Sequence, residues 1–431
     1  MELRFVPSRL EKVENLENYA PSGYHPVHVG QIFDDGRYRI IHKLGHGASS
    51  TVWLVRDLQE HVYAAMKIYR ADQIKAAAAE LAALHHVTQN ATTPGRQYIV
   101  ELLGSFHIDG PNGRHQCLIL QIAGPSIRSF SEAPGKISGY KRLHPQLARS
   151  LSRHVTEGLA CLHAIGILHG DLTPSNVLVS MDFIQTMSEQ ELLELIGQPV
   201  CEDVHLNNVG RASMSQLPDS APAYIVAPCD IMAAYRTLRT CRALVTDLNL
   251  SHISGVTQGC AALPVEDLGR TSVSYAAPEL IFGSQSSFSS DIWSLACVLY
   301  AICAGREMFE SFFGTEDEVL QQMVQSLGRL PDEMWIRWDS RKHFIAKDGS
   351  FQRMSRDVWP LDSLRKMVQD IGVCDEGKDV TEQAPSMTIT GDTRLSQEEV
   401  AELLELLDKA LIYDPAARPT ATSLLRCTWL S

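Results

Sequence analysis

Asp171 and Asn176 are the two residues of this 431-residue chain whose types and spacing most directly suggest a chemical reaction. They stand five positions apart within residues 168–179, LHGDLTPSNVLV, and apolar runs flank them. The Asp171 carboxylate could orient an attacking hydroxyl group and accept its proton, and Asn176 could give an oxygen ligand to a metal that neutralises phosphate charge. The stretch therefore favours a catalytic loop for phosphoryl transfer. The alternative is an Asp and an Asn in a turn before a buried strand.

The elements that must position this loop begin with three short runs in residues 37–70, which alternate apolar and polar residues and predict an antiparallel meander. Gly45, Gly47 and Ser50 lie between the first two runs. Small residues at this place would let backbone N–H groups approach phosphates. An ordinary hairpin turn would also explain them.

Helices and further strands follow. Residues 72–84 predict an Ala-rich helix in which Glu80 lies beside an apolar stripe of Ile74, Ala77, Leu81 and Leu84. The alternative for Glu80 is a solvated helix glutamate. Residues 98–106 and 116–122 predict two strands around a polar turn, and residues 145–165 show helical periodicity.

These motifs, together with three later ones, resemble the signatures of the protein kinases. The catalytic loop resembles H-R-D-L-x-x-x-N with Gly170 in place of Arg, the glycines resemble the glycine-rich loop, and residues 64–67 (AAMK) resemble V-A-I-K. The later motifs are residues 274–279 (SYAAPE), 290–300 (SDIWSLACVLY) and 413–420 (YDPAARPT). These three occur in protein kinases and not in small-molecule kinases, which share the His-Gly-Asp pattern and are the remote alternative.

The resemblance implies ATP and Mg²⁺ as cofactors. Asp171 would act as the base, Lys67 would neutralise phosphates while Glu80 holds it, and Asn176 and Asp247 would bind the metal. Thr173 stands where Ser/Thr kinases have a Lys that contacts the transferred phosphate. The residues implied to contact the nucleotide are Gly45, His46, Gly47, Ala48, Ser49, Ser50, Val52, Ala65, Lys67, Leu120, Gln121, Ala123 and Leu178.

The implied fold class is α+β, a bilobal protein-kinase fold with a small antiparallel-sheet lobe and a mainly helical lobe. The expected boundaries are a lead-in at 1–36 with little regular structure, the small lobe at 37–123 and the large lobe at 124–431, with an insertion after the catalytic loop at about 182–243. Glu279 is expected to pair with Arg418 in a buried ion pair, and Asp291 to hold the backbone of the catalytic loop.

Several stretches resemble the SR-protein kinases in particular, especially the fungal ones. They are residues 23–28 (GYHPVH), 36–39 (GRYR), 50–57 (STVWLVRD), 334–338 (MWIRW) and 414–420 (DPAARPT). This resemblance implies a serine/threonine kinase that acts on basic Arg/Ser-rich proteins, such as mRNA-processing factors, and docks them in acidic grooves.

Three departures from the kinase pattern bear on activity. Thr173 carries no charge, and one missing preorganised cation costs about 2–4 kcal/mol of transition-state stabilisation, so a weak or dead pseudokinase that binds nucleotide as a scaffold is the alternative. Asn249 replaces the D-F-G glycine and is the commonest non-Gly residue able to adopt a positive φ, so the motif remains physically workable. Gly170 replaces an Arg that commonly pairs with a phosphorylated activation segment, which predicts activity independent of that phosphorylation. The alternative is that Gly170 suits a tight turn and a distant Arg substitutes.

Composition sets the remaining expectations. With 45% apolar residues the chain can bury a large core, and no stretch of about 18 apolar residues predicts a membrane span. A formal net charge of −13 disfavours direct binding to nucleic acid or to a membrane. Ten scattered cysteines without C-x-x-C pairs favour reduced thiols in the cytoplasm or nucleus. We expect a monomer.

Overall fold

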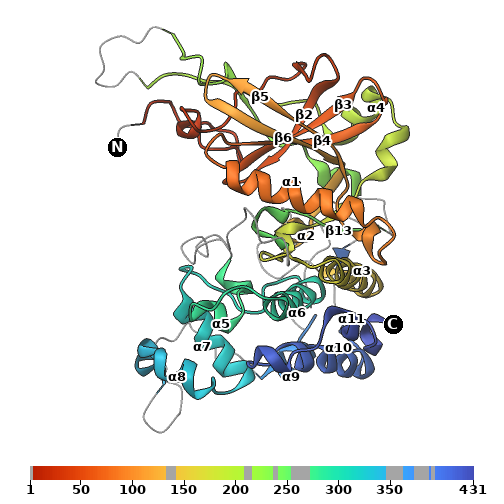
Figure 1. Ribbon diagram of the computed structural model, residues 1–431, viewed down its shortest axis with the longest axis vertical. Coiled ribbons are helices and arrows are strands. Elements are labelled where there is room, and N and C mark those ends of the chain that lie inside the picture. The colour runs from red at the N-terminus through yellow and green to blue at the C-terminus, as the bar shows by residue number, and fades with distance from the viewer. Residues whose placement is uncertain are drawn as a thin grey trace. The chain divides into compact units, whose positions relative to one another are not determined.

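Six antiparallel strands build one sheet in the order β1-β2-β3-β4-β6-β5. The computed structural model describes residues 3–132, 142–207, 216–235, 241–253, 272–345, 363–372, 388–389 and 394–431. The strands are β1 (Ile32–Phe33), β2 (Tyr38–His46), β3 (Ser50–Asp57), β4 (Tyr63–Tyr69), β5 (Leu102–Gly110) and β6 (Gly113–Gln121). Helix α1 (Ile74–Gln89) packs on β5 and β6 (Figure 1).

The central strand β4 is buried along its whole length. Successive side chains of a strand point to opposite faces of the sheet. Ala64, Met66 and Ile68 join a core that also takes in Val27 and Val226. Lys67, between them in sequence, points to the face that α1 covers, where it pairs with a helix residue.

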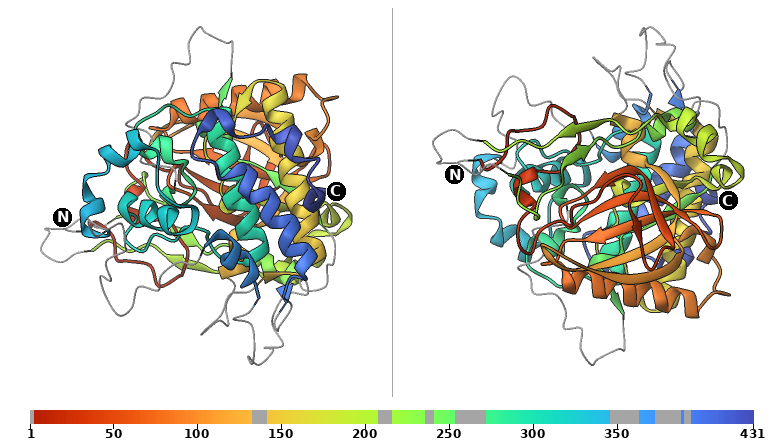
Figure 2. Two further views of the ribbon diagram at one scale, coloured as in Figure 1. Left: turned by 90° about the horizontal axis from the view of Figure 1, so that it is seen from below. Right: turned by 90° about the horizontal axis from the view of Figure 1, so that it is seen from above.

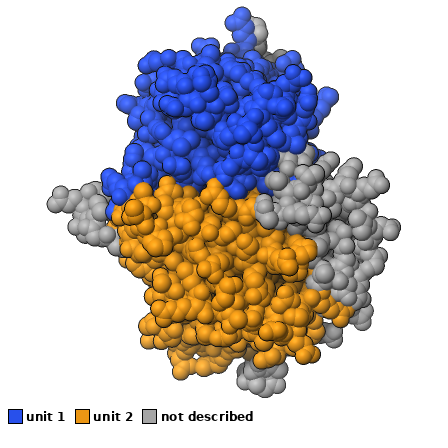
Figure 3. All heavy atoms as spheres, turned by 90° about the vertical axis from the view of Figure 1, so that its right-hand side faces the viewer, with its two compact units in different colours: residues 1–89, 100–124, 180–235 blue, residues 90–99, 125–179, 236–431 orange. Residues whose placement is uncertain are grey.

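The chain forms two compact units (Figure 3). Unit 1 comprises residues 1–89, 100–124 and 180–235, and unit 2 comprises residues 90–99, 125–179 and 236–431. The expected boundaries differ from these at two places. Residues 90–99 belong to unit 2, where Ile99 pairs with Val245, and residues 180–235, which include most of the insertion, belong to unit 1 rather than to the large lobe.

The lead-in is irregular, as expected, apart from β1 and the 3-10 helix η1 (Leu16–Asn18). The folded part does not begin near residue 36, however, because Phe5, Leu16, Tyr19 and Tyr24 are buried against residues of the insertion. The insertion supplies the 3-10 helices η4 (Asp182–Thr186) and η5 (Ile231–Tyr235), helix α4 (Glu189–Ile196), and the paired strands β11 (Cys201–Asp203) and β12 (Tyr224–Val226). The buried apolar residues of the lead-in are irregularly spaced and share no face of a helix or strand. Its sequence therefore shows no helical or strand periodicity.

Unit 2 is mainly helical. Its α-helices are α2 (Ile127–Glu132), α3 (Pro145–Ala164), α5 (Pro278–Ile281), α6 (Phe288–Ala304), α7 (Glu316–Leu327), α8 (Asp332–Arg337), α9 (Leu364–Gln369), α10 (Gln397–Ala410) and α11 (Ala421–Leu424). Helices α3, α6 and α10 lie side by side (Figure 2). Helix α6 is apolar nearly all round, and it is therefore buried on all sides between its neighbours.

Short strands and 3-10 helices complete unit 2. The strand pairs are β9 (Ile167–Leu168) with β14 (His252–Ile253), β10 (Val177–Ser180) with β13 (Ala243–Val245), and β8 (Arg142–Leu143) with β15 (Thr388–Ile389). Strand β7 spans Ala123–Ser126, where the sequence passes from unit 1 to unit 2. The 3-10 helices are η2 (Arg96–Tyr98), η3 (Pro174–Asn176), η6 (Leu248–Leu250), η8 (Val273–Tyr275), η9 (Asp339–His343), η11 (Pro415–Ala417) and η12 (Thr428–Leu430). Among the described helices, none has the length and apolar character needed to cross a membrane.

Candidate active site

The loop between β9 and β10 holds the carboxylate of Asp171 in a fixed direction. Asn176 Nδ2 donates to Asp171 Oδ2 at 3.0 Å and to the Asp171 carbonyl oxygen at 2.8 Å. The turn closes through η3, where the Asn176 N–H donates to the Thr173 carbonyl at 3.0 Å. Asp171 Oδ1 is buried and has no hydrogen-bond partner among the described residues. One carboxylate oxygen is thus anchored and the other remains to receive a proton.

The backbone of this loop is fixed by Asp291 of α6, as the sequence predicted. Asp291 Oδ2 accepts from the His169 N–H at 2.8 Å and from His163 Nε2 at 2.9 Å, and Oδ1 accepts from the Gly170 N–H at 3.0 Å. The Asp291 side chain is only 2% exposed. These charge-assisted bonds attach the catalytic loop to the most buried helix of unit 2.

Gly170 has a conformational reason to be glycine. Its φ is +79°, and a Cβ atom would lie 2.7 Å from the carbonyl oxygen of Leu250. A residue with a side chain would be strained in this backbone conformation and would also clash. This geometry agrees with the alternative that Gly170 suits a tight turn.

Asp247 follows β13 directly and lies near the catalytic loop, since the neighbouring Thr246 N–H donates to the Asn176 carbonyl at 3.0 Å. Asp247 itself adopts φ +64°, whereas Asn249 lies inside η6. The positive φ of this segment therefore falls on Asp247, and the ability of Asn249 to adopt one is not used. Asp tolerates the left-handed region because its short polar side chain can make local hydrogen bonds.

Burial, followed by the negative charge of Asp247, raises the pKa of Asp171 to about 7, while the hydrogen bond from Asn176 opposes the rise. A base with this pKa is half ionised near neutral pH, which suits proton transfer. The negative charge of Asp247 beside the Asp171 carboxyl group also marks a place where a bound cation would be favourable.

Lys67 and Glu80 form an ion pair inside unit 1. Lys67 Nζ lies 2.7 Å from Glu80 Oε2, with Lys67 on β4 and Glu80 on α1. Tyr69 also donates to Glu80 Oε2. Glu80 is fully buried, so the alternative of a solvated glutamate is wrong.

Sequence reasoning missed Tyr69, although strand alternation places residues 67 and 69 on the same face of β4. It also misplaced Ile74, which is 69% exposed. The buried face of α1 consists instead of Ala76, Ala77, Glu80, Ala83, Leu84 and Val87.

The loop at residues 45–50, which we call the nucleotide loop, is a tight hairpin between β2 and β3. Gly45 pairs with Val52 and His46 with Thr51, and the Gly47 N–H donates to the Ser50 carbonyl at 2.9 Å. A Cβ atom on Gly45 or Gly47 would meet nothing within 4 Å, and neither residue has a positive φ. The fold itself therefore does not require glycine at these two positions.

The remaining residues that the sequence predicted to contact the nucleotide belong to both units. Ala65 of β4 and Leu120 of β6 are buried cross-strand partners. The Gln121 N–H donates to the Glu101 carbonyl at 2.8 Å. Leu178 lies on β10 opposite Leu244.

The predicted site residues are thus brought together in two groups, one within each unit. Unit 1 holds the nucleotide loop, Lys67, Glu80 and the residues at 120–123; unit 2 holds Asp171, Thr173, Asn176, Leu178 and Asp247. Among the described residues, no group of three or more His, Cys, Asp or Glu side chains is arranged to hold a metal ion. Two oxygen-bearing side chains suit Mg²⁺, which usually takes its other ligands from phosphates and water.

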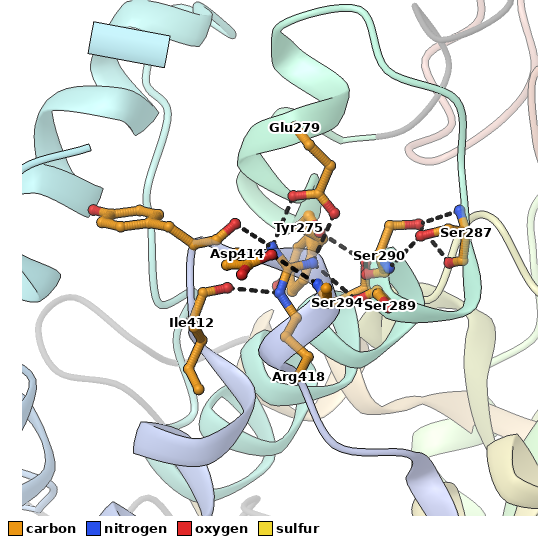
Figure 4. Close-up of polar contacts among 11 residues, drawn as sticks. Tyr275, Glu279, Ser287, Ser289, Ser290, Ser294, Ile412, Asp414 and Arg418 are labelled. Carbon is orange, nitrogen blue, oxygen red and sulfur yellow. Dashed lines mark hydrogen bonds and ion pairs between the residues drawn. The ribbon is translucent and has the colours of Figure 1, made fainter. Parts of the chain in front are cut away.

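A second buried ion pair lies away from these groups and was predicted from the sequence. Arg418 binds Glu279 through two bonds of 2.7 Å and donates to the carbonyl oxygens of Ile412 and Ser289 at 2.7 and 2.9 Å (Figure 4). The pair fastens η11 to α5 and to the start of α6. Its role is structural, and the prediction is confirmed.

A model of the protein kinase domain matches residues 38–187 and 261–430, which is most of the chain. The chain belongs to the protein kinase family. A solved structure of a kinase domain aligns with 95% of this chain and 99% of its own chain, with a TM-score of 0.57 and 18% sequence identity. This similarity confirms the expected bilobal α+β fold.

Several relatives of this kinase are SR-protein kinases by name, as the sequence predicted. Protein kinase dsk1 of Schizosaccharomyces pombe is 24% identical over 98% of this chain and 86% of its own length. The serine/threonine-protein kinase SRPK of Physarum polycephalum is 25% identical over 97% of this chain and 91% of its own length. SRSF protein kinase 3 of Homo sapiens is 35% identical over 39% of this chain and 30% of its own length.

Proposed function

We propose that this kinase is an active ATP-dependent serine/threonine kinase of the SR-protein-kinase type, which phosphorylates serines in Arg/Ser-rich proteins. The observation that carries the activity is the state of Asp171. One of its oxygens is held by Asn176, the other is buried without a partner, and its pKa lies at about 7. A carboxylate held in this way is prepared to accept the proton of a serine hydroxyl.

The other residues fit the cofactors of the family. Bound ATP with Mg²⁺ would supply the phosphoryl group and the positive charge that stabilises its transfer. Asp247 would give the metal a charged oxygen. Asn176, whose Nδ2 already makes two hydrogen bonds, would give its amide oxygen. Lys67, oriented by Glu80, would bind the α- and β-phosphates.

The substrate class rests on the relatives and on charge. Relatives over most of this chain and over shorter parts of it carry the names SRPK and SRSF protein kinase. A formal net charge of −13 favours a basic partner, because long-range attraction speeds the encounter of opposite charges. Arg-Ser repeats have this charge and also present the serine hydroxyl.

A nucleotide-binding scaffold without transfer is the second candidate, and Thr173 favours it. This side chain is buried at 7% exposure and has no charge to offer a phosphate. We expect Thr173→Lys to raise the turnover number if the missing cation limits the rate. An unchanged or lower turnover would mean that another group of the loop already contacts the transferred phosphate.

The deciding experiment gives the purified full chain labelled ATP, Mg²⁺ and an Arg-Ser repeat peptide, beside two variants. Asp171→Ala removes the proposed base, and Asp332→Ala removes an Asp of the same unit whose side chain is 78% exposed. Label transfer by the native protein and by Asp332→Ala, but not by Asp171→Ala, would support the enzyme. Nucleotide binding without transfer by the native protein would establish the scaffold instead.

A further inference from the structure

The lead-in and the insertion fold together into one small core, which we call the accessory core. Its buried residues are Phe5, Leu16, Tyr19, Tyr24, Val204, Ala221 and Ile225. The backbone also joins the two segments, since the Val6 N–H donates to the His205 carbonyl at 2.9 Å and the Asn207 N–H to the Arg4 carbonyl at 2.8 Å. Every one of these residues lies outside the ranges matched by the kinase domain model. This chain therefore adds a folded element to unit 1 that the family model does not contain.

Tyr24 connects the accessory core to the tip of the nucleotide loop. Its ring is 2% exposed, and its hydroxyl donates to the carbonyl oxygen of Gly47 at 2.7 Å. The next two carbonyl groups of the tip are also held, because Arg70 donates from Nη1 to Ala48 at 3.3 Å and from its backbone N–H to Ser49 at 2.8 Å. The Arg70 guanidinium in turn lies 5.4 Å from the centroid of the Tyr24 ring.

Holding a carbonyl group also aims an N–H group. The C=O of one residue and the N–H of the next share a planar trans peptide unit, so they point in opposite directions. The bond from Tyr24 to the Gly47 carbonyl therefore directs the Ala48 N–H away from the accessory core. In the same way, the bond from Arg70 to the Ala48 carbonyl directs the Ser49 N–H. Backbone N–H groups fixed in this manner are the groups that bind phosphates.

The base of the nucleotide loop is held by both segments of the addition. Lys43, two residues before Gly45, is fully buried and forms an ion pair with Glu14 of the lead-in. Glu14 also accepts from the Tyr19 hydroxyl at 2.5 Å. The Lys43 carbonyl accepts from the N–H of Cys229 in the insertion at 2.9 Å. The strand that leads into the loop is thus fixed before the loop begins.

We propose that the accessory core positions the nucleotide loop for phosphate binding, and that Tyr24 is the positioning residue at its tip. The inference rests on the proposed function, because it requires that the loop bind the phosphates of ATP. Tyr24 does not touch the nucleotide in this role. It acts through the Gly47 carbonyl and fixes the N–H groups that do.

The test compares two variants that each remove one tyrosine hydroxyl donating to a backbone carbonyl in unit 1. Tyr24→Phe removes the bond to Gly47, and the matched control Tyr63→Phe removes the 3.3 Å bond to the Met187 carbonyl, away from the loop. Both rings stay buried, and thermal unfolding checks that each variant folds. The dissociation constants of ATP and of adenosine are measured by calorimetry for both variants and for the native chain, and kcat and KM for ATP are measured with an Arg-Ser peptide.

We expect Tyr24→Phe to weaken ATP binding and raise KM by about two- to tenfold, as the loss of one hydrogen bond would, with little change in kcat. Adenosine, which lacks phosphates, should bind it as tightly as it binds the native chain, and Tyr63→Phe should bind ATP normally. Native ATP affinity in Tyr24→Phe, or an equal loss for ATP and adenosine, would overturn the positioning role while leaving the proposed kinase activity standing. No ATP binding by the native chain would instead overturn the proposed function and this inference with it.

Discussion

Replacing Asp171 with Asn is expected to stabilise the protein at pH 8 and to leave its stability nearly unchanged at pH 4. The reason is the raised pKa of this carboxyl group, about 7 in the folded chain against an ordinary value of 3.8. Between these two values the folded state holds a proton that the unfolded state has released. The native protein therefore loses stability as the pH rises through this range.

The magnitude follows from the size of the shift. Each unit of pKa corresponds to about 1.4 kcal/mol, so ionised Asp171 costs the fold about 4 kcal/mol once the pH exceeds 7. The new amide does not titrate and can still accept the hydrogen bond from Asn176. The difference in the free energy of unfolding between variant and native chain should therefore grow by about 1.4 kcal/mol per pH unit from about pH 4 to pH 7, and then stay constant.

Urea unfolding at pH 4, 5, 6, 7 and 8, without nucleotide or divalent metal, measures this difference. Asp332→Asn is the control for the same change of side chain at the surface, because the Asp332 side chain is 78% exposed. Asp171→Asn should also abolish label transfer, which separates the gain in stability from the loss of function. A stability difference for Asp171→Asn that is the same at all five pH values would refute the argument that burial and Asp247 raise this pKa.

Four further outcomes are expected. Asp247→Ala should remove the Mg²⁺ dependence of ATP binding, measured by calorimetry with and without the metal, and an unchanged dependence would assign the metal ligand elsewhere. Lys67→Met should lower turnover and, because its partner Glu80 is fully buried, also lower the free energy of unfolding in urea by about 3–5 kcal/mol. Glu279→Ala should cost a similar amount of stability without a direct effect on ATP affinity, since it leaves a buried guanidinium unpaired. Phosphatase treatment should leave turnover unchanged, and mass spectrometry maps the phosphorylation before and after it. A loss of turnover that follows the dephosphorylation of one Ser or Thr at 250–275 would contradict this; residues 254–271 lie outside the described residues.

The sequence correctly identified those site residues that lie within one short motif or on elements that follow each other closely in the chain. Asp171 and Asn176 stand five positions apart in one loop, which let the sequence identify them together, and the structure joins them by a hydrogen bond of 3.0 Å. Glu80 was identified because it lies two turns into a helix that follows Lys67 closely. In each case the contact is local, or it joins neighbouring elements whose periodicity is clear.

The parts that the sequence did not predict depend on backbone angles or on irregular packing. The positive φ of Asp247 was not foreseen, because residue preference pointed only to Asn249, two positions later, as a residue able to adopt it. Phe5 and Tyr24 are buried against residues of the insertion, which lie about 200 positions later in the sequence. No local hydrophobic pattern in the lead-in signals this burial. Such contacts are visible only once the chain is folded.

The attachment of the catalytic loop to Asp291 has a consequence for how the chain folds during synthesis. The bond from the His169 N–H to this carboxylate joins residues 122 positions apart. At 5–20 residues per second a ribosome needs roughly 6 to 24 s to make that stretch, so the loop emerges well before the helix that holds it. Contacts of such long sequence separation form late and slow the folding rate. We therefore expect the catalytic loop to be among the last parts of the nascent kinase to reach its final conformation, and the protein to be inactive until α6 has been synthesised and packed.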